Sequence, residues 1–238
     1  ALTCENIGNW FSDSQSSLTS VTLGECVKSI GSGAFSGCTG LTSICIPNSV
    51  ISIGNYAFSG CTGLASMEIS NNVTSIGHSA FSGCTGLTSL TIPNSVTSIG
   101  NNTFYGCSGL TSLTLNCPEI ENWFSDSQAK VETLTLGEDV KVVQPSAFEG
   151  FSSIKSIVFP QDITKIGEKA CFGCSSLTEI SIGAEIAEIG NLAFANCPKL
   201  DDVWCYAIRY PATATDAFKD SYIDYVILHV PAKGLKQY

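Results

Sequence analysis

The 238-residue sequence is poor in charge, and basic residues are the scarcer kind. Charged residues make up 13% of the chain, and 11 Lys and Arg against 21 Asp and Glu give a net charge of −10. No cluster of basic residues is present, which argues against nucleic acid and anionic membrane surfaces as partners. The apolar fraction of 44% suits a folded chain with a long core and is too high for a disordered one.

Long apolar runs are missing as well. No stretch reaches the ~18 apolar residues of a membrane-spanning helix, and the start of the chain lacks the hydrophobic region of a signal peptide. We therefore expect no insertion into a membrane.

Residues suited to catalysis or metal binding are scarce. The two histidines, His78 and His229, do not lie near a recurrent nucleophile, so no Ser/His/Asp or Cys/His site can be assembled. The glycines form no phosphate-binding loop, and the acids lack the short, oxygen-rich spacing of a calcium loop. The sequence predicts no enzyme, no cofactor and no metal site.

What the sequence does contain is a repeat. Large aliphatic residues recur 23 positions apart, with one step of 21, at Leu18, Leu41, Leu64, Leu87, Leu110, Val131, Ile154, Leu177 and Leu200. A fixed period of this length with a leucine pattern predicts a leucine-rich-repeat solenoid, α/β horseshoe-like and rich in β-structure, of about ten coils.

The repeat from Leu41 to Gly63 predicts the structure of one coil. Leu41, Ile44 and Ile46 have the L-x-x-L-x-L spacing of a repeat strand, which points the isoleucines inward and the residue between them outward. Pro47 ends this strand, because proline cannot donate a hydrogen bond to a sheet. A short second strand follows.

The remainder of the coil carries Gly54, Ala57, Phe58 and Cys61, each at a recurrent position. The spacing of the last three predicts a short helical or 3₁₀ turn. The fixed glycine suggests a backbone bend that other residues tolerate poorly. Phe58 and its equivalents should form a buried spine.

Cysteines make up 12 residues of the chain, and six share one position three residues before the repeat leucine: Cys38, Cys61, Cys84, Cys107, Cys174 and Cys197. Coils spaced ~4.8 Å apart would permit disulfides between them, but stacked side chains point in parallel, so we expect buried free thiols. Cys171 occupies the recurrent phenylalanine position, which makes the Cys171-x-x-Cys174 pair an apolar replacement rather than half of a zinc site.

The string Trp-Phe-Ser-Asp-Ser-Gln occurs twice, at Trp10–Gln15 and Trp123–Gln128. It could be an aromatic recognition loop or a second type of coil that packs its tryptophan inward. The shared register favours the second reading. It also places the start of the chain in the middle of a strand, so we expect a segment of a longer protein.

The motif Ile-Pro-Asn-Ser-Val-x-Ser-Ile-Gly-x-x-Ala-Phe-x-Gly-Cys-x-x-Leu, seen from Ile46 to Leu64, resembles the BspA-like leucine-rich repeats of bacterial and protozoan surface proteins. The segments Tyr206–Phe218 and Val226–Tyr238 are similar to the last coil and the closing segment of that family, whose ending normally runs on past the tyrosine. The resemblance implies a secreted or surface-attached protein, a role in adhesion for several members, and no catalytic residues.

The outward strand positions are the candidate binding surface. They carry mostly serine and threonine, and the residues that break this pattern are our candidate ligand-binding residues: Glu68, Val158, Glu179, Asp202 and Trp204. Trp204 supports two readings, as a recognition residue or as part of a cap over the last coil.

The expected organisation is one solenoid over residues 1–238. It comprises a partial first coil at 1–17, regular coils at 18–205 with an irregular coil near 116–130, and a C-terminal coil and closing strand at 206–238. We expect a monomeric, non-catalytic module at the cell surface or outside the cell that binds a protein or glycan. The alternative is a structural spacer within a larger surface protein.

Overall fold

The computed structural model describes residues 5–8, 17–124, 130–221 and 227–230. In these segments the chain is a parallel-strand β-solenoid with about 9 coils of ~23 residues. Strands and turns make up the described segments, and no helix is formed in them. The chain divides into two compact units, residues 1–113 with 123–129 (unit 1) and residues 114–122 with 130–238 (unit 2). The fold class is thus confirmed as a repeat solenoid, without its α component.

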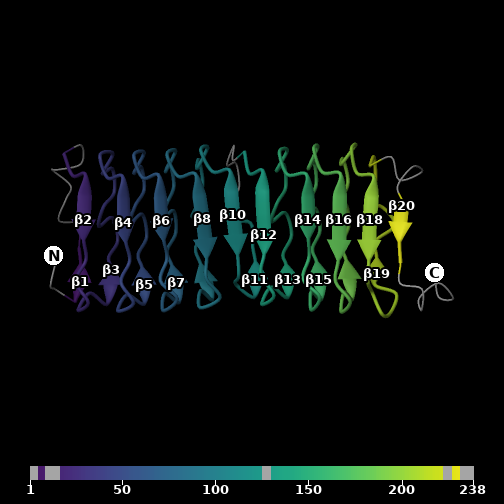
Figure 1. The fold of residues 1–238 in the computed structure, drawn as a ribbon, viewed down its shortest axis with the longest axis horizontal. Helices are drawn as coiled ribbons and strands as arrows, with labels where there is room; N and C mark the ends of the chain where they lie inside the picture. Colours follow the sequence, from purple (N-terminus) through teal and green to yellow (C-terminus); the bar gives the residue numbers. More distant parts are fainter. Residues whose placement is uncertain (1–4, 9–16, 125–129, 222–226, 231–238) are drawn as a thin grey trace. The chain divides into compact units, whose positions relative to one another are not determined.

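Unit 1 alternates longer and very short strands (Figure 1). The longer strands are β2 (Ser20–Thr22), β4 (Ser43–Cys45), β6 (Ser66–Glu68) and β8 (Ser89–Ile92). The short strands are β1 (Asn6–Ile7), β3 (Ser29–Ile30), β5 (Ser52–Ile53), β7 (Ser75–Ile76) and β9 (Ser98–Ile99). Strand β10 (Ser112–Leu115) spans the boundary between the units.

Unit 2 has the same alternation. Its longer strands are β12 (Thr133–Leu136), β14 (Ser156–Val158), β16 (Glu179–Ile182), β18 (Asp202–Cys205) and β20 (Ile227–His229). Its short strands are β11 (Glu119–Ile120), β13 (Val142–Val143), β15 (Lys165–Ile166), β17 (Glu188–Ile189) and β19 (Ala212–Thr213).

Strands of successive coils pair in parallel, and in the regular coils the register advances by one repeat. Ile44 of β4 pairs with Val21 of β2 and with Met67 of β6, and in unit 2 Ile180 of β16 pairs with Ile157 of β14. In-register pairing stacks equivalent side chains, so the inward positions form continuous buried lanes and the outward positions form lanes on the surface. The predicted alternation of inward and outward residues is confirmed, with Ile44 buried and Cys45 exposed.

The predicted helical or 3₁₀ turn is wrong for the described coils. The N–H of Phe35 donates to the Ala57 carbonyl of the next coil at 2.7 Å, whereas the N–H of Ser36 donates to Gly33, three residues back, at 3.0 Å. A 3₁₀ helix would use every N–H within its own turn. Here alternate N–H groups bond to the neighbouring coil, and the turn itself becomes part of the stack.

The phenylalanine spine is confirmed in unit 1. The rings of Phe35, Phe58, Phe81, Phe104 and Phe124 stack in sequence with centroids 5.1–5.6 Å apart. Phe124 continues the spine in the irregular coil, and Trp123 beside it is only 4% exposed. The prediction that this tryptophan packs inward is confirmed; Trp10, in the other copy of the string, lies outside the described residues.

The ladder cysteines are buried free thiols, as predicted. Five ladder thiols donate a hydrogen bond to a carbonyl of the preceding coil, for example Cys61 Sγ to the Phe35 oxygen at 3.1 Å; the others are Cys84, Cys107, Cys174 and Cys197. Burial raises the pKa of Cys61 to about 12, because the thiolate would lose its hydration. Cys171 is fully buried at the phenylalanine position, as its spacing predicted.

The recurrent glycine at Gly54 is required for a different reason from the predicted bend. Its φ is not positive, but a Cβ at this position would lie 2.6 Å from the backbone nitrogen of Ser32 in the preceding coil. Close approach of two backbones therefore excludes a side chain. Left-handed backbone occurs instead at Gly60, with φ +73°, where the nearest atom to an added Cβ is 3.7 Å away.

A bilayer-spanning helix, which needs both length and an apolar surface, is not found in the described part of the chain.

Candidate functional site

The outward faces of the longer strands form the surface on which the candidate residues lie. In unit 1 this surface is dominated by small hydroxyl side chains, with Ser43, Ser66 and Ser89 all exposed. Glu68 is exposed on β6 and lies with Glu25 and Cys45 at an open hollow near the strand ends. It belongs to unit 1, whereas the four other candidates belong to unit 2.

Strands β14, β16, β18 and β20 bring the four unit 2 candidates together. Their register places side chains in two outward lanes. One lane contains Val158, Ser181, Trp204 and His229, and the other contains Ser156, Glu179, Asp202 and Ile227. Val158 is 64% exposed, an unusual position for an aliphatic residue in an otherwise polar lane.

Trp204 lies on the outward face of β18 and is partly exposed. Its ring stacks on His229 of β20, with centroids 3.7 Å apart and planes only 6° from parallel. His229 Nε2 is 2.9 Å from Asp202 Oδ1, so the carboxylate orients the imidazole. Trp204, His229 and Asp202 therefore form one linked group on two strands.

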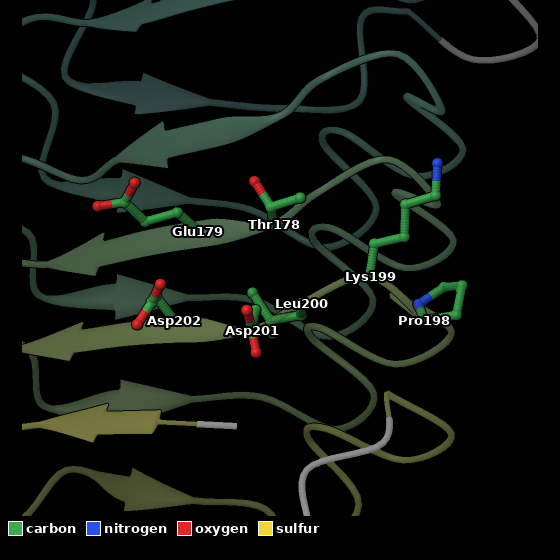
Figure 2. Close-up of a pocket in the computed structure, with 7 residues that line it drawn as sticks. All are labelled: Thr178, Glu179, Pro198, Lys199, Leu200, Asp201 and Asp202. Carbon is green, nitrogen blue, oxygen red and sulfur yellow. The ribbon is translucent and has the colours of Figure 1, made fainter. Parts of the chain in front are cut away.

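The carboxylates of Glu179 and Asp202 lie side by side at the edge of an open hollow on unit 2 (Figure 2). The hollow is lined by Thr178, Glu179, Pro198, Lys199, Leu200, Asp201 and Asp202. Figure 2 shows Lys199 directed away from the carboxylate pair. The result is an acidic surface next to an aromatic group.

The arrangement offers no metal centre in the described residues, where no group of three or more His, Cys, Asp or Glu side chains is placed to hold an ion. The second histidine, His78, contacts Tyr56 edge-on in unit 1 and lies near Ser79 Oγ, at 3.2 Å. Among the contacts of the described residues, none joins a carboxylate to the His78 imidazole, whereas a Ser/His/Asp triad uses such an acid to orient its histidine.

His229 is the site residue that the sequence prediction missed. Its strand pairs with β18 through Asp202 and Ile227, which are 25 positions apart instead of 23. A strict repeat register therefore does not place His229 beside Trp204. The available signal was the closing segment itself, whose run Val-Ile-Leu-His-Val is rich in the residues that favour one more strand.

Comparisons with known proteins agree with this architecture. The family model of the BspA type leucine-rich repeat region, which contains six copies, matches residues 5–128, 81–201 and 119–236. A comparison of the sequence with curated proteins found no match.

Solved structures with a similar fold come from several bacteria. A leucine-rich repeat protein from Bacteroides ovatus is 24% identical, with a TM-score of 0.56, over 94% of this chain and 66% of its own length. A leucine-rich cell surface protein from Faecalibacterium prausnitzii is 24% identical, with a TM-score of 0.46, over 89% of this chain and 73% of its own. The pneumococcal vaccine antigen PcpA is 19% identical, with a TM-score of 0.41, over 92% of this chain and 75% of its own. The Bacteroides ovatus structure supports the fold, and this chain spans about two thirds of that protein's length.

Proposed function

Because the chain belongs to the BspA-type leucine-rich repeat family, we propose that it is a non-enzymatic interaction module that binds a protein or glycan at or outside the cell surface. Repeat proteins of this kind present an extended sheet whose outward positions are free to vary without disturbing the core. The binding surface in this proposal is the outward face of β14, β16, β18 and β20, which we call the unit 2 face.

The single observation that carries the proposal is the change of chemistry on the unit 2 face. Val158, Glu179, Asp202 and Trp204 occupy outward positions that unit 1 fills mostly with serine and threonine, where Cys45 and Glu68 are the exceptions. Folding does not require these replacements, because the inward lanes hold the core. Tryptophan is one of the residue types enriched at the energetic centres of interfaces, and Trp204 is partly exposed.

The position of Trp204 favours recognition over capping. The indole lies on the outward face of β18, whereas the buried residues of β18 point inward, so the Trp204 ring does not cover them. The next strand in the stack, β20, pairs with the free edge of β18. Location at the cell surface rests on the family, whose members are typically secreted or surface-attached. The acidic net charge of −10 is compatible with that location and selects against polyanionic partners.

The experiment is a ligand screen with a variant that restores the hydroxyl pattern. The chain is immobilised and exposed to a glycan array and to a panel of host matrix and microbial surface proteins. The test variant carries Val158→Thr, Glu179→Ser, Asp202→Ser and Trp204→Thr. The control variant carries Glu149→Ser in an exposed turn outside the unit 2 face. Both should keep the melting curve of the parent chain within a few degrees.

The proposal expects a reproducible ligand that the control retains and the test variant loses. If the test variant still binds the ligand, the binding site lies on a surface other than the unit 2 face. Absence of any reproducible ligand supports the alternative function, a structural spacer.

A further inference from the structure

The Trp204 ring has two faces, and only one is used by the described residues. A ring separation of 3.7 Å with planes 6° from parallel means that the rings of Trp204 and His229 overlap, so the ring normal runs from β18 towards β20. The opposite face of Trp204 therefore points along the sheet towards β16. There the residue in register is Ser181, one of the smallest side chains available.

Ser181 is the smallest side chain of its outward lane, and we call the space over it, between its two neighbours, the gap. Its neighbours on the two sides are Val158 of β14 and Trp204 of β18. Two strand spacings separate these neighbours, roughly 9–10 Å. A planar group in van der Waals contact on both sides needs about 7–8 Å, since each contact takes roughly 3.5–4.0 Å. The gap thus accommodates one flat group, with an aromatic ring on one side and an exposed aliphatic side chain on the other.

The charge beside the gap is negative and unneutralised. Glu179 lies two residues before Ser181 on the same strand and is exposed. Among the described residues, ion pairs join Lys141 to Asp162 and Lys165 to Glu188, and the imidazole of His229 contacts Asp202. Glu179 takes part in none of these contacts. Asp202 already accepts from His229, which leaves Glu179 as the carboxylate available to a ligand.

We propose that this gap binds an arginine side chain of a partner protein, stacked between Trp204 and Val158 over Ser181 and paired with Glu179. The inference rests on the proposed function and specifies its partner. A guanidinium is flat and always charged, stacks on tryptophan, and donates two parallel hydrogen bonds to a carboxylate. A lysine ammonium is compact and cannot fill the slot, and a neutral sugar leaves Glu179 without a counter-charge. The partner is therefore a basic, arginine-containing protein segment.

The test uses a capped hexapeptide of three Gly-Arg units, titrated into the whole chain by calorimetry at low ionic strength. Matched peptides carry citrulline, which keeps the shape and removes the charge, or lysine. We expect the arginine peptide to bind about 5–10-fold more tightly than the lysine peptide, and the citrulline peptide to show no measurable binding.

Three variants identify the site. Glu179→Gln and Trp204→Leu should each weaken the arginine peptide by about 5–10-fold, since a charge-assisted pair and a cation–π contact are each worth ~1 kcal/mol or more. Ser181→Leu fills the gap and leaves Trp204 and Glu179 in place, so it should weaken binding at least as much even if Trp204→Leu disturbs the sheet. Glu149→Gln, the control, removes the same charge from an exposed turn of unit 2 outside the outward strand face and should change the affinity less than 2-fold.

Three results would overturn the inference. Equal affinities for the arginine and citrulline peptides would show that the positive charge does not contribute to binding, so no pair with Glu179 forms. Equal losses of affinity in Glu149→Gln and Glu179→Gln show that the peptide is attracted to an acidic protein in general and not to this site. If a glycan binds through Trp204 and the arginine peptide does not bind, the arginine site is refuted and the proposed function is kept. If neither the peptide nor any ligand of the screen binds, the arginine site and the proposed function are both refuted.

Discussion

Replacement of Phe81 by alanine tests how the coils hold together. Phe81 is fully buried in unit 1 and stacks on Phe58 and Phe104, with centroids at 5.3 and 5.6 Å and planes 5° apart in both pairs. Truncation of a buried phenylalanine to alanine costs about 3–5 kcal/mol. Phe81→Leu keeps most of the side-chain volume but loses two aromatic pairs, each worth ~0.5–1.5 kcal/mol. The free energy of unfolding should therefore fall by about 1–3 kcal/mol in this variant.

Urea unfolding measures these free energies, and native-state hydrogen exchange shows where they act. In an array stabilised by nearest-neighbour contacts the loss is local. Protection should fall most at the amides of Phe58 and Phe81, which bond to carbonyls of the next coil, and less at Phe35. A cost below about 1 kcal/mol for Phe81→Ala, or an equal loss of protection at Phe35 and Phe81, would refute the stacked spine as a source of stability.

The remaining predictions concern the cysteines and glycines. In the native chain at pH 8, a thiol reagent should modify exposed Cys26 and Cys45 while the ladder cysteines react only on unfolding, which mass spectrometry of the peptides reports. Burial raises the pKa of Cys61, Cys107, Cys117 and Cys197 from 9.0 to about 12, so the folded state holds protons that the unfolded state loses. Stability should therefore fall progressively as the pH rises from 9 to 12. Unfolding curves that do not change over that interval would contradict this. Gly54→Ala should lower the melting temperature more than Gly60→Ala, because a Cβ at position 54 forces two backbones apart. At position 60 the alanine only has to adopt the left-handed φ of +73°, which costs about 1–2 kcal/mol. Equal melting temperatures of the two variants would show that the close approach is absent.

Sequence periodicity predicted the parts of the fold that repeat in every coil. The inward positions of the strands, the phenylalanine spine and the cysteine ladder recur at one register, so a single coil defines them all. The irregular coil keeps the same buried spine, because the ring of Phe124 stacks on that of Phe104. These features depend on side-chain burial, which a sequence pattern records directly.

Features that depend on the neighbouring coil could not be derived in the same way. The spacing of Ala57, Phe58 and Cys61 is shared by a helical turn and by this turn, and only the bond from Phe58 N–H to the Ala80 carbonyl separates them. The reason for Gly54 is likewise a contact with the coil before it. His229 was missed because the final strand departs from the period of the repeat. The five candidate residues on the strand face remain predictions until a ligand is tested.

The most direct test of the account is the indole N–H signal of Trp204 in an NMR titration with the arginine peptide. The signal is assigned by its loss in Trp204→Leu, and Trp123, which is 4% exposed, provides an internal reference. The account predicts a saturable shift of the Trp204 signal that the citrulline peptide and Ser181→Leu both abolish, with no change at Trp123. A Trp204 signal that stays in place at saturating peptide would contradict the claim that the unit 2 face is the binding surface for such a partner.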